Sequence, residues 1–463
     1  MGKTNIKLSA CTAAGQVVEV LAAVNEVRPG PPWRHHDLRG AGEWAMAGLA
    51  DLAGRHPIGH LIPTGHGSGG VLVGDDPDNG AVLPMVDYEQ ALPAGLDADY
   101  APLSGGFLDR GSAVMHGATH QARQLFWMER AEPAAFARAR WYLGLPQYWA
   151  WWLTGIPASE ITMMGAQSHL WNVPERRFAP IVASQGWGRL MPGFAAPWAV
   201  LGLLRPALAQ RYGLPEGMAV HTGLHDSSAN FTRYQAAGLR DLAVVSTGTW
   251  IVALADRVPM ESLMEAQGMT CNADITGAPL GGALTMGGRE FSAVAGEQAE
   301  GARVDAGILA QLVASGTLAL PMFGPGGGQF PGRAGRGRIV GPAPVMPAER
   351  LALAVLYAAL LTVACIDKLG ASRRVVLDGS FLRDPAFAGL VAALRPGAET
   401  LYNPESYGVA AGAALLCCHP HQTPTPIRLE RPDPLWQTIP GLARYGARWR
   451  DLAGKAPIKG NEP

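Results

Sequence analysis

The segment GLHDSSAN (residues 223–230) places a carboxylate where an apolar strand is expected to end and a helix to begin. Asp226 follows the strand directly, and Ser227 and Ser228 favour a helix start. At such strand ends in α/β proteins, a carboxylate can accept a proton from a substrate hydroxyl as its oxygen attacks. An aspartate here can equally serve only to cap the helix, and this segment alone leaves both interpretations open.

Two further segments have the composition of phosphate-binding turns. In STGTW (246–250), two apolar arms meet at a turn whose backbone N–H groups and the hydroxyls of Thr247 and Thr249 could hold phosphate oxygens. In GKTNIKL (2–8), Lys3, Thr4 and Asn5 could do the same. The end of a P-loop is an alternative for this second segment, but strand-like residues follow Lys3 where a P-loop requires a helix. An ordinary hairpin turn and a chance match stay open for each segment alone.

The elements that would position these residues alternate between strands and helices in two groups. Strand, glycine turn and strand are predicted for residues 6–20 and again for 60–76, and strand followed by helix for 218–231 and 373–394. This pattern predicts an α/β protein with two centres and a boundary between residues 230 and 242. The predicted domains are residues 1–235 and 236–450, followed by a tail over 451–463.

Composition narrows the functional classes. The formal net charge of −1 and the absence of a basic stripe argue against nucleic acid and anionic membrane surfaces as partners. The five scattered cysteines form no disulfide framework and no C-x-x-C metal motif, which favours a reduced, cytoplasmic protein. The longest uncharged run (351–366) is too short for a membrane span and predicts a buried helix.

Several other segments have competing interpretations. The tryptophan cluster at 149–152 could stack on a sugar, but core packing is the preferred interpretation. His35 and His36 fit no standard metal spacing and are expected in a solvated loop. Arg289 and Glu290 could form a structural ion pair or reach a nucleotide. The Gly- and Pro-rich stretch 322–345 is expected to be a plain loop.

Taken in order, the motifs resemble those of the FGGY carbohydrate kinases, within the sugar kinase, Hsp70 and actin superfamily. The match runs over nearly the whole chain, and the His-Asp pair with STGTW is most similar to the rhamnulose and fuculose kinase branch. The segments that support the resemblance are GKTN (2–5), TGHG (64–67), YWAWWLTG (148–155), His225-Asp226, STGTW (246–250), VVLDGSFLRDP (375–385) and YGVAAGAAL (407–415).

The resemblance implies two ribonuclease H-like, actin-like ATPase domains with an interdomain cleft. It implies that the protein uses ATP and Mg²⁺ to phosphorylate a sugar hydroxyl. The implied substrate is a ketose or deoxyketose such as rhamnulose, fuculose or a ketopentose. Asp226 would be the catalytic base, and the chain could pair as a homodimer. The residues assigned to the sugar are Gly67, Gln124, His225 and Asp226. The residues assigned to ATP are Lys3, Thr4, Asn5, Thr247, Gly248, Thr249, Gly379 and Ser380.

The sequence also departs from the family pattern. In the family a strand ending in an aspartate near the Mg²⁺ precedes the first glycine, and this first strand is missing before Gly2, so no metal ligand is assigned. The adenosine turn has one glycine, Gly379, where two or three are usual, and Gly69 and Gly70 replace larger sugar-contacting residues. These departures keep a second hypothesis open, in which the chain is a catalytically impaired protein that binds a sugar or a nucleotide on the same fold.

Overall fold

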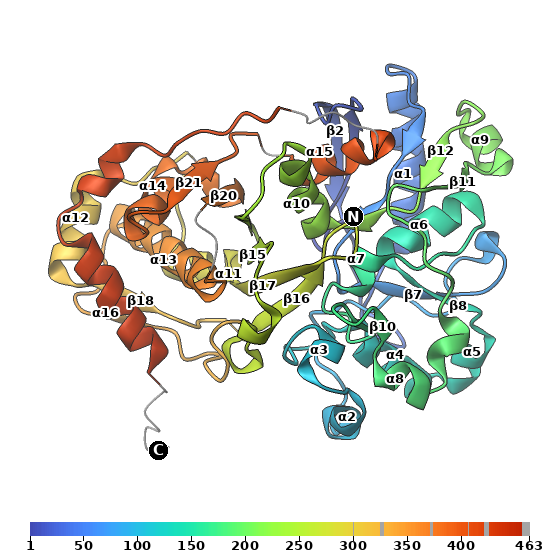
Figure 1. The fold of residues 1–463 in the computed structure, drawn as a ribbon, viewed down its shortest axis with the longest axis horizontal. Helices are drawn as coiled ribbons and strands as arrows, with labels where there is room; N and C mark the ends of the chain where they lie inside the picture. Colours follow the sequence, from blue (N-terminus) through green and yellow to red (C-terminus); the bar gives the residue numbers. More distant parts are fainter. Residues whose placement is uncertain (300, 325–327, 371–373, 406, 421–425, 456–463) are drawn as a thin grey trace. The chain divides into compact units, whose positions relative to one another are not determined.

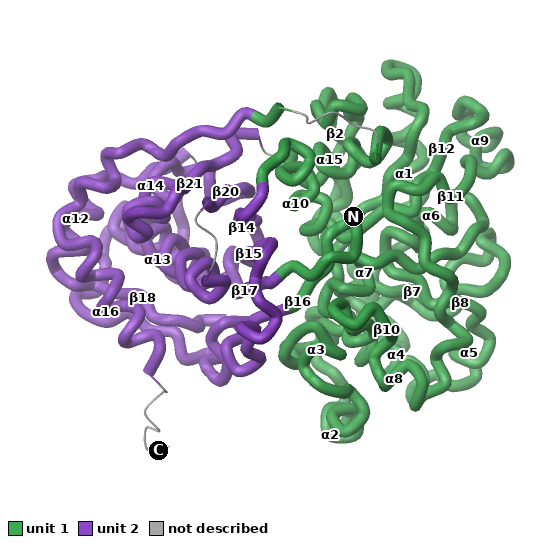
Figure 2. Tube along the Cα trace, in the orientation of Figure 1, with its two compact units in different colours: residues 1–239, 271–280, 407–427 green, residues 240–270, 281–406, 428–463 purple. Residues whose placement is uncertain are grey.

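The computed structural model describes the chain except for residues 300, 325–327, 371–373, 406, 421–425 and 456–463. The chain forms two compact units, coloured separately in Figure 2. Unit 1 contains Met1–Leu239, Cys271–Leu280 and Tyr407–Ile427, and unit 2 contains Arg240–Thr270, Gly281–Ser406 and Arg428–Pro463. Strands and helices alternate in both units, which confirms the predicted α/β organisation with two centres. After unit 2 begins, the chain returns to unit 1 twice, at Cys271–Leu280 and at Tyr407–Ile427. A single boundary between two domains does not describe these returns.

Unit 1 consists of small sheets with helices between them (Figure 1). Its strands are β1 (Asn5–Cys11), β2 (Val17–Val24), β3 (Val27–Arg28), β4 (His35–His36), β5 (His60–Leu61), β6 (Thr64–Gly65), β7 (Gly70–Val73), β8 (Trp141–Gly144), β9 (Trp171–Asn172), β10 (Arg177–Phe178), β11 (Val200–Leu203), β12 (Ala219–His221) and β13 (Leu224–His225). Its helices are α1 (Leu38–Ala53), α2 (Leu96–Tyr100), α3 (Phe107–Arg110), α4 (Gln121–Ala131), α5 (Pro133–Arg138), α6 (Leu145–Thr154), α7 (Ile161–Met164), α8 (Pro180–Ser184), α9 (Pro206–Tyr212), α10 (Asp226–Ala236) and α15 (Gly408–Ala414).

The predicted strand, glycine turn and strand at the start of the chain is confirmed. β1 and β2 pair antiparallel, and Gly15 closes the turn between them with a φ of +81°, a conformation that glycine adopts without a Cβ clash. The prediction for residues 218–231 is also confirmed, because β12 and β13 lead directly into α10.

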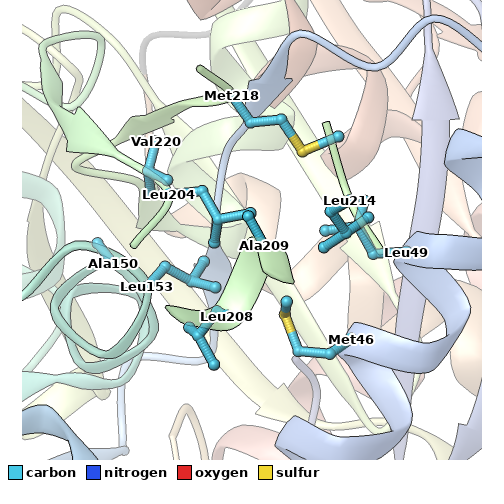
Figure 3. Packing of buried hydrophobic residues seen from close by; sticks show 10 residues of the cluster. All are labelled: Met46, Leu49, Ala150, Leu153, Leu204, Leu208, Ala209, Leu214, Met218 and Val220. Atoms are coloured by element: carbon cyan, nitrogen blue, oxygen red, sulfur yellow. The ribbon is translucent and has the colours of Figure 1, made fainter. Parts of the chain in front are cut away.

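One core cluster of unit 1 is drawn in Figure 3. Met46 and Leu49 of α1 meet Ala150 and Leu153 of α6, and Leu208 of α9 closes the cluster. Burying each of these larger apolar side chains contributes about 1.5–3 kcal/mol. Helices α1, α6 and α9 thereby fix the strands that follow them in the chain.

The predicted core role of the tryptophan cluster is confirmed. Trp151 is fully buried, and Trp149 and Trp152 pack against the cluster that contains it.

Unit 2 contains most of a six-stranded sheet of order β16-β17-β15-β14-β20-β21, and the chain crosses between the units within β16 and β17. The strands from β14 onward are β14 (Leu242–Thr247), β15 (Trp250–Ala255), β16 (Met269–Ala273), β17 (Pro279–Met286), β18 (Leu318–Leu320), β19 (Arg338–Val340), β20 (Arg374–Gly379) and β21 (Glu399–Tyr402). The helices of unit 2 are α11 (Gly288–Ala295), α12 (Ala306–Ser315), α13 (Pro347–Lys368), α14 (Pro385–Leu394) and α16 (Leu442–Gly454).

Helix α13 is the central helix of unit 2 and contacts α11, α12 and α14 (Figure 1). Within the described part of the chain, it is the one helix long and apolar enough to cross a membrane, and 83% of its apolar window is buried inside the protein. The predicted buried helix is therefore confirmed.

Two local predictions are wrong. His35 and His36 form strand β4 rather than a solvated loop, and the side chain of His36 is fully buried because it packs 4.0 Å from Asp87. The stretch 322–345 is not wholly irregular, because β19 pairs antiparallel with β18 despite the surrounding glycines.

Candidate active site

Asp226 occupies the first position of α10, directly after β13. Strand β13 pairs in parallel with β6, with Leu224 opposite Thr64 and His225 opposite Gly65. The Asp226 side chain is 33% exposed, and its Oδ1 accepts a hydrogen bond of 2.6 Å from the Ser227 N–H. The unpaired N–H groups at a helix start favour a negative charge. The fold thus presents a carboxylate that is accessible and anchored at one oxygen.

His225 lies beside this carboxylate, with its Nε2 atom 3.2 Å from Asp226 Oδ1. Burial lowers the pKa of His225, which favours the neutral imidazole. The Nδ1 atom lies 3.3 Å from the Ser228 hydroxyl oxygen, whose proton is donated to the Ala273 carbonyl oxygen at 3.0 Å. A carboxylate oxygen can only accept, so Nε2 makes a favourable contact with Asp226 Oδ1 only as a donor. Both neighbours of the ring accept from it, and the single proton of the neutral imidazole serves one of them at a time.

Behind His225 stands a buried carboxyl group that the sequence analysis missed. Glu160 caps α7 by accepting hydrogen bonds from the backbone N–H groups of Thr162 and Met163 and from the Thr162 hydroxyl. The Thr162 oxygen in turn accepts from the His225 backbone N–H at 3.0 Å. Burial raises the pKa of Glu160 to about 7. The sequence signal for this group was the pattern E-x-T before a short helix. In this pattern the carboxyl group of the helix N-cap stands two residues before a threonine hydroxyl.

The turn after β6 faces the same histidine. A Cβ atom added to Gly67 would lie 3.3 Å from His225 Nε2 and 2.7 Å from the Ala166 Cβ, so only glycine allows this approach. The Gly67 carbonyl oxygen accepts a hydrogen bond from Gln121 Nε2 at 2.8 Å. Gln124 Nε2 donates to the carbonyl oxygens of Ser68 and Ala118. The structure therefore brings together Gly67, Gln124, His225 and Asp226, all predicted for the sugar.

Several buried polar atoms around this turn have no hydrogen-bond partner among the residues that the structure describes. They are Oε1 of Gln121, Oε1 of Gln124 and both ring nitrogens of His66. Leaving a buried polar atom unpaired costs about 1–3 kcal/mol, so such atoms are commonly satisfied by water or a ligand. Gln121 and His66 were not predicted; their positions beside Gln124 and within TGHG were the only signals in the sequence.

The glycines that follow have a steric explanation. A Cβ atom on Gly70 would lie 1.8 Å from the Tyr142 hydroxyl oxygen, so this tyrosine fills the space that a larger residue at position 70 would need. The Tyr142 hydroxyl is buried and has no hydrogen-bond partner in the described part of the chain. The small glycine at position 70 thus leaves room for the large polar side chain of Tyr142 from β8.

The first residues of the chain also belong to unit 1. The Met1 α-amino group donates to the Thr64 carbonyl oxygen at 2.5 Å. Burial lowers the pKa of this amino group to about 6, and the charge of Asp226 acts in the opposite direction. Lys3 Nζ lies 2.5 Å from Asp87 Oδ1.

The neighbours of Lys3 are held by backbone contacts. The Thr4 carbonyl oxygen accepts from the Asn25 N–H, and Asn5 begins β1 opposite Val24. The assignment of Lys3, Thr4 and Asn5 to phosphate stays a prediction, and binding there would compete with the ion pair between Lys3 and Asp87.

In unit 2 the other predicted nucleotide residues meet through the sheet. Thr247 of β14 is the register partner of Gly379 of β20. The Thr247 hydroxyl donates to the Asp378 carbonyl oxygen at 2.8 Å and accepts from the Phe381 N–H at 3.3 Å. Gly379 has a φ of +102°, and a Cβ atom there would lie 2.1 Å from the Thr247 carbonyl oxygen. Ser380 follows at the surface of the same turn.

The tip of the β14–β15 hairpin is less constrained. Thr249 is exposed, and a Cβ atom on Gly248 would have no neighbour within 4 Å. The Gly248 and Thr249 carbonyl oxygens accept from the Gly288 N–H at the start of α11. The hairpin tip is thereby held against α11 while its outer surface stays accessible.

Glu290 of α11 has a structural role. It is fully buried and accepts hydrogen bonds from the Phe323 and Gly324 N–H groups and from the Tyr357 hydroxyl. These contacts give Glu290 a structural role through hydrogen bonds, while both alternatives for Arg289 stay predictions.

Comparisons with known proteins identify the family of the chain. The model of the FGGY carbohydrate kinase N-terminal domain matches residues 108–232, and that of the C-terminal domain matches residues 240–426. A solved carbohydrate kinase from Novosphingobium aromaticivorans is 30% identical, with a TM-score of 0.82 over 98% of this chain and 99% of that one. The chain belongs to the FGGY family of carbohydrate kinases.

More distant members of the family share the fold. A xylulose kinase from Lactobacillus acidophilus superposes with a TM-score of 0.78 at 16% identity, over 98% of this chain and 97% of that one. The implied two-domain, actin-like ATPase fold is therefore confirmed.

Among curated proteins, the chain matches L-fuculokinases. The one from Salmonella typhi is 30% identical over 155 residues, and the one from Escherichia coli K12 is 28% identical over 156. These matches cover 33% of this chain and 32% of either relative, so the chain matches about a third of their length.

Proposed function

We propose that this protein transfers the γ-phosphoryl group of ATP to a sugar hydroxyl, with Asp226 as the general base. The observation that supports this most directly is the accessible Asp226 carboxylate at the start of α10, beside a neutral histidine and a turn with unpaired buried polar atoms. The substrate we propose is a ketose or deoxyketose such as rhamnulose, fuculose or a ketopentose. Similarity to L-fuculokinases over a third of the chain supports this class of sugar.

In the proposed reaction, the sugar hydroxyl binds within hydrogen-bond reach of the free Asp226 oxygen. As the sugar oxygen bonds to the γ-phosphorus, the bond from that phosphorus to the β,γ-bridging oxygen breaks and ADP leaves. The hydroxyl proton passes to the Asp226 carboxylate. The protein contributes by positioning the hydroxyl and accepting its proton.

His225 and the glutamines would orient the sugar. The Oε1 atoms of Gln121 and Gln124 are acceptors without a partner among the described residues, a sugar offers hydroxyl donors, and His225 holds its ring beside Asp226. Sites built to pair substrate hydroxyl groups discriminate strongly against analogues that lack them, because their buried polar atoms would then stay unpaired. Specificity for a particular sugar would therefore depend on which of its carbons carry these hydroxyls.

We propose that ATP is bound by residues of unit 2, at the hairpin tip with Thr247, Gly248 and Thr249 and at the turn with Gly379 and Ser380. The exposed side chains of Thr249 and Ser380 support this. The Mg²⁺ that the family implies would enter on the nucleotide phosphates and supply charge neutralisation. In the described residues no cluster of three carboxylates occurs near Asp226, which fits Mg²⁺ with water and phosphate as most of its ligands.

The proposal is tested by measuring ADP release from ATP and Mg²⁺ with a panel of ketoses, aldoses and polyols. Asp226→Asn is assayed in parallel, with Asp99→Asn as a matched control because Asp99 is an exposed aspartate in the first turn of α2. Turnover with one class of sugar that is lost in Asp226→Asn and kept in Asp99→Asn is the expected result.

Two other outcomes would contradict parts of the proposal. Turnover that survives Asp226→Asn would keep the kinase and reject Asp226 as its base. A folded protein that binds ATP or a sugar and turns over none of the panel would favour the alternative, a catalytically impaired binding protein on this fold.

A further inference from the structure

Three metal-ligating side chains converge in unit 1 at a place the kinase reaction does not use. His60 comes from β5, His221 from β12, and Cys417 from the single 3₁₀ turn Leu415–Cys418 after α15. One ligand atom of each lies within 4.8 Å of those of the other two. They come from three segments far apart in sequence, so no short sequence motif predicts the cluster.

The sheet register explains why the two histidines meet. Strands β5 and β12 pair in parallel with His60 opposite Ala219, and His221 lies two residues further along β12. Alternate residues of a strand point to the same face, so both histidines lie on one face of this sheet. The Nδ1 atom of His60 is 3.0 Å from the Nε2 atom of His221.

His221 is already oriented as a ligand. Its Nδ1 atom lies 2.8 Å from the Trp198 carbonyl oxygen, to which it donates its proton, so Nε2 carries the lone pair and directs it at His60. Metal-ligating histidines usually donate the second ring N–H to a carbonyl or carboxylate, which fixes the tautomer. His221 is buried, which keeps this geometry rigid, while His60 is exposed and leaves a route to solvent.

Cys417 is held in place by its neighbours. Leu416 packs with Leu224 and Ala229 in the core of unit 1, and the His419 ring lies 4.2 Å from the Trp198 ring. Trp198 thus contacts both sides of the cluster, through its carbonyl oxygen to His221 and through its ring to His419. Burial raises the pKa of the Cys417 thiol to about 11, so the free protein keeps the proton on sulfur.

We propose that His60, His221 and Cys417 bind one Zn²⁺ ion, with water as the fourth ligand. Imidazole nitrogen and thiolate sulfur are the donors that Zn²⁺ prefers, in tetrahedral geometry, at about 2.0–2.1 Å and 2.3 Å respectively. A Zn²⁺ ion with these bond lengths requires particular separations between its three protein ligand atoms. Small movements of the three side chains would give those separations. Binding would release the Cys417 thiol proton, whereas the His60 proton would move from Nδ1 to Nε2 of the same ring.

The site would stabilise unit 1 without entering the kinase reaction. Cys417 belongs to the segment Tyr407–Ile427, which returns to unit 1 late in the chain, whereas His60 and His221 belong to its first segment. A bound ion would therefore link the returning segment to the β5–β12 sheet. An ion that binds the folded state alone raises the melting temperature in a concentration-dependent way.

The test uses the full-length protein, freed of metal by a chelator and then titrated with Zn²⁺ and, separately, with Co²⁺ as a spectroscopic probe. We expect one ion per chain, a thiolate-to-Co²⁺ charge-transfer band that Zn²⁺ abolishes, and a higher melting temperature with Zn²⁺. Cys417→Ser should remove the band and weaken binding by about 100-fold. Cys418→Ser is the matched control, because this neighbouring thiol is exposed and lies outside the cluster; it should bind as the parent does.

His60→Asn gives a second variant at an exposed position, in case Cys417→Ser does not fold. It should keep the charge-transfer band, weaken binding and reduce the Zn²⁺-dependent rise in melting temperature. Unchanged affinity in His60→Asn and Cys417→Ser, or no Zn²⁺ binding by the folded parent, would overturn the proposal and leave the contact as a hydrogen bond between two histidines. ADP release is not a readout here, so failure of this proposal is separable from failure of the kinase proposal.

Discussion

The Asp226 region of unit 1 and the Thr247–Gly379 pair of unit 2 are built by opposite means. Around Asp226, side chains from several segments supply polar groups, and some of their buried atoms have no hydrogen-bond partner within the described ranges of the chain. At Thr247 and Gly379, two adjacent strands approach closely, and the threonine hydroxyl is already used between Asp378 and Phe381. The first region keeps hydrogen-bonding capacity for a ligand, whereas the second offers a shaped backbone. Substitutions should therefore affect chemistry in the first and stability in the second.

The largest expected effect is on the chemical step. Asp226→Asn should lower kcat by about 10²–10⁴-fold, because the amide cannot accept the hydroxyl proton while it keeps the shape of the side chain. The melting temperature should change little, since the side chain is partly exposed. Steady-state ADP release and thermal unfolding of the same preparations check both halves of this prediction. A large loss of stability would mean that Asp226 is mainly a helix cap.

The next largest effect is on stability and concerns Glu160, the buried carboxyl group behind His225 in the Asp226 region. The pKa of Glu160 is raised from 4.5 to about 7 in the folded protein, so between these values the folded protein keeps a proton that the unfolded chain releases. The free energy of unfolding should therefore fall as pH rises through this window, by about 3 kcal/mol for this group.

Glu160→Gln keeps the shape of the side chain but does not titrate, so it should remove this part of the slope. Urea unfolding from pH 4 to 8 measures it. Glu43→Gln, at an exposed carboxylate, is the control and should leave the slope unchanged. An identical pH dependence in parent and Glu160→Gln would refute the assignment.

In the second region the sharpest test compares two glycines. Gly379→Ala should destabilise the protein by about 2–3 kcal/mol, because the new Cβ would meet the Thr247 carbonyl at 2.1 Å and φ is +102°. Gly248→Ala should change stability by less than about 0.5 kcal/mol, since its Cβ has no neighbour within 4 Å. Denaturant unfolding measures both. Equal stability of the two variants would show that the close approach of β14 and β20 is not rigid.

The smallest effect should come from the Thr247 hydroxyl. Thr247→Val removes its bonds to Asp378 and Phe381 and should cost about 1–2 kcal/mol of stability. Ser380→Ala is the control; its hydroxyl is exposed and makes only a 3.4 Å contact with the Thr247 carbonyl, so its effect should be within about 0.5 kcal/mol. If Thr247→Val were neutral for stability and lowered ATP affinity instead, the hydroxyl would belong to the ligand rather than to the fold.

Much of the local structure was predictable, because local patterns dictate it. Alternating apolar residues around Gly15 predicted the β1–β2 hairpin, and the apolar run 351–366 predicted the buried helix α13. His36 was mispredicted because two adjacent polar residues suggest solvent, whereas contacts with Asp87, distant in sequence, bury this one. Residues 338–340 gained a strand only because β18 offers a partner.

For the candidate site, the sequence by itself determined the order of the motifs and the placement of Asp226 at a helix start, since strand periodicity and helix-start residues are local properties. Only the tertiary structure decided which residues surround Asp226. Glu160 reaches His225 through Thr162, Gln121 reaches Gly67, and Tyr142 fills the space beside Gly70. The same is true of His60, His221 and Cys417. Such neighbours depend on strand register and on where a returning segment packs, and these are set by burial of the whole core rather than by any short stretch of chain.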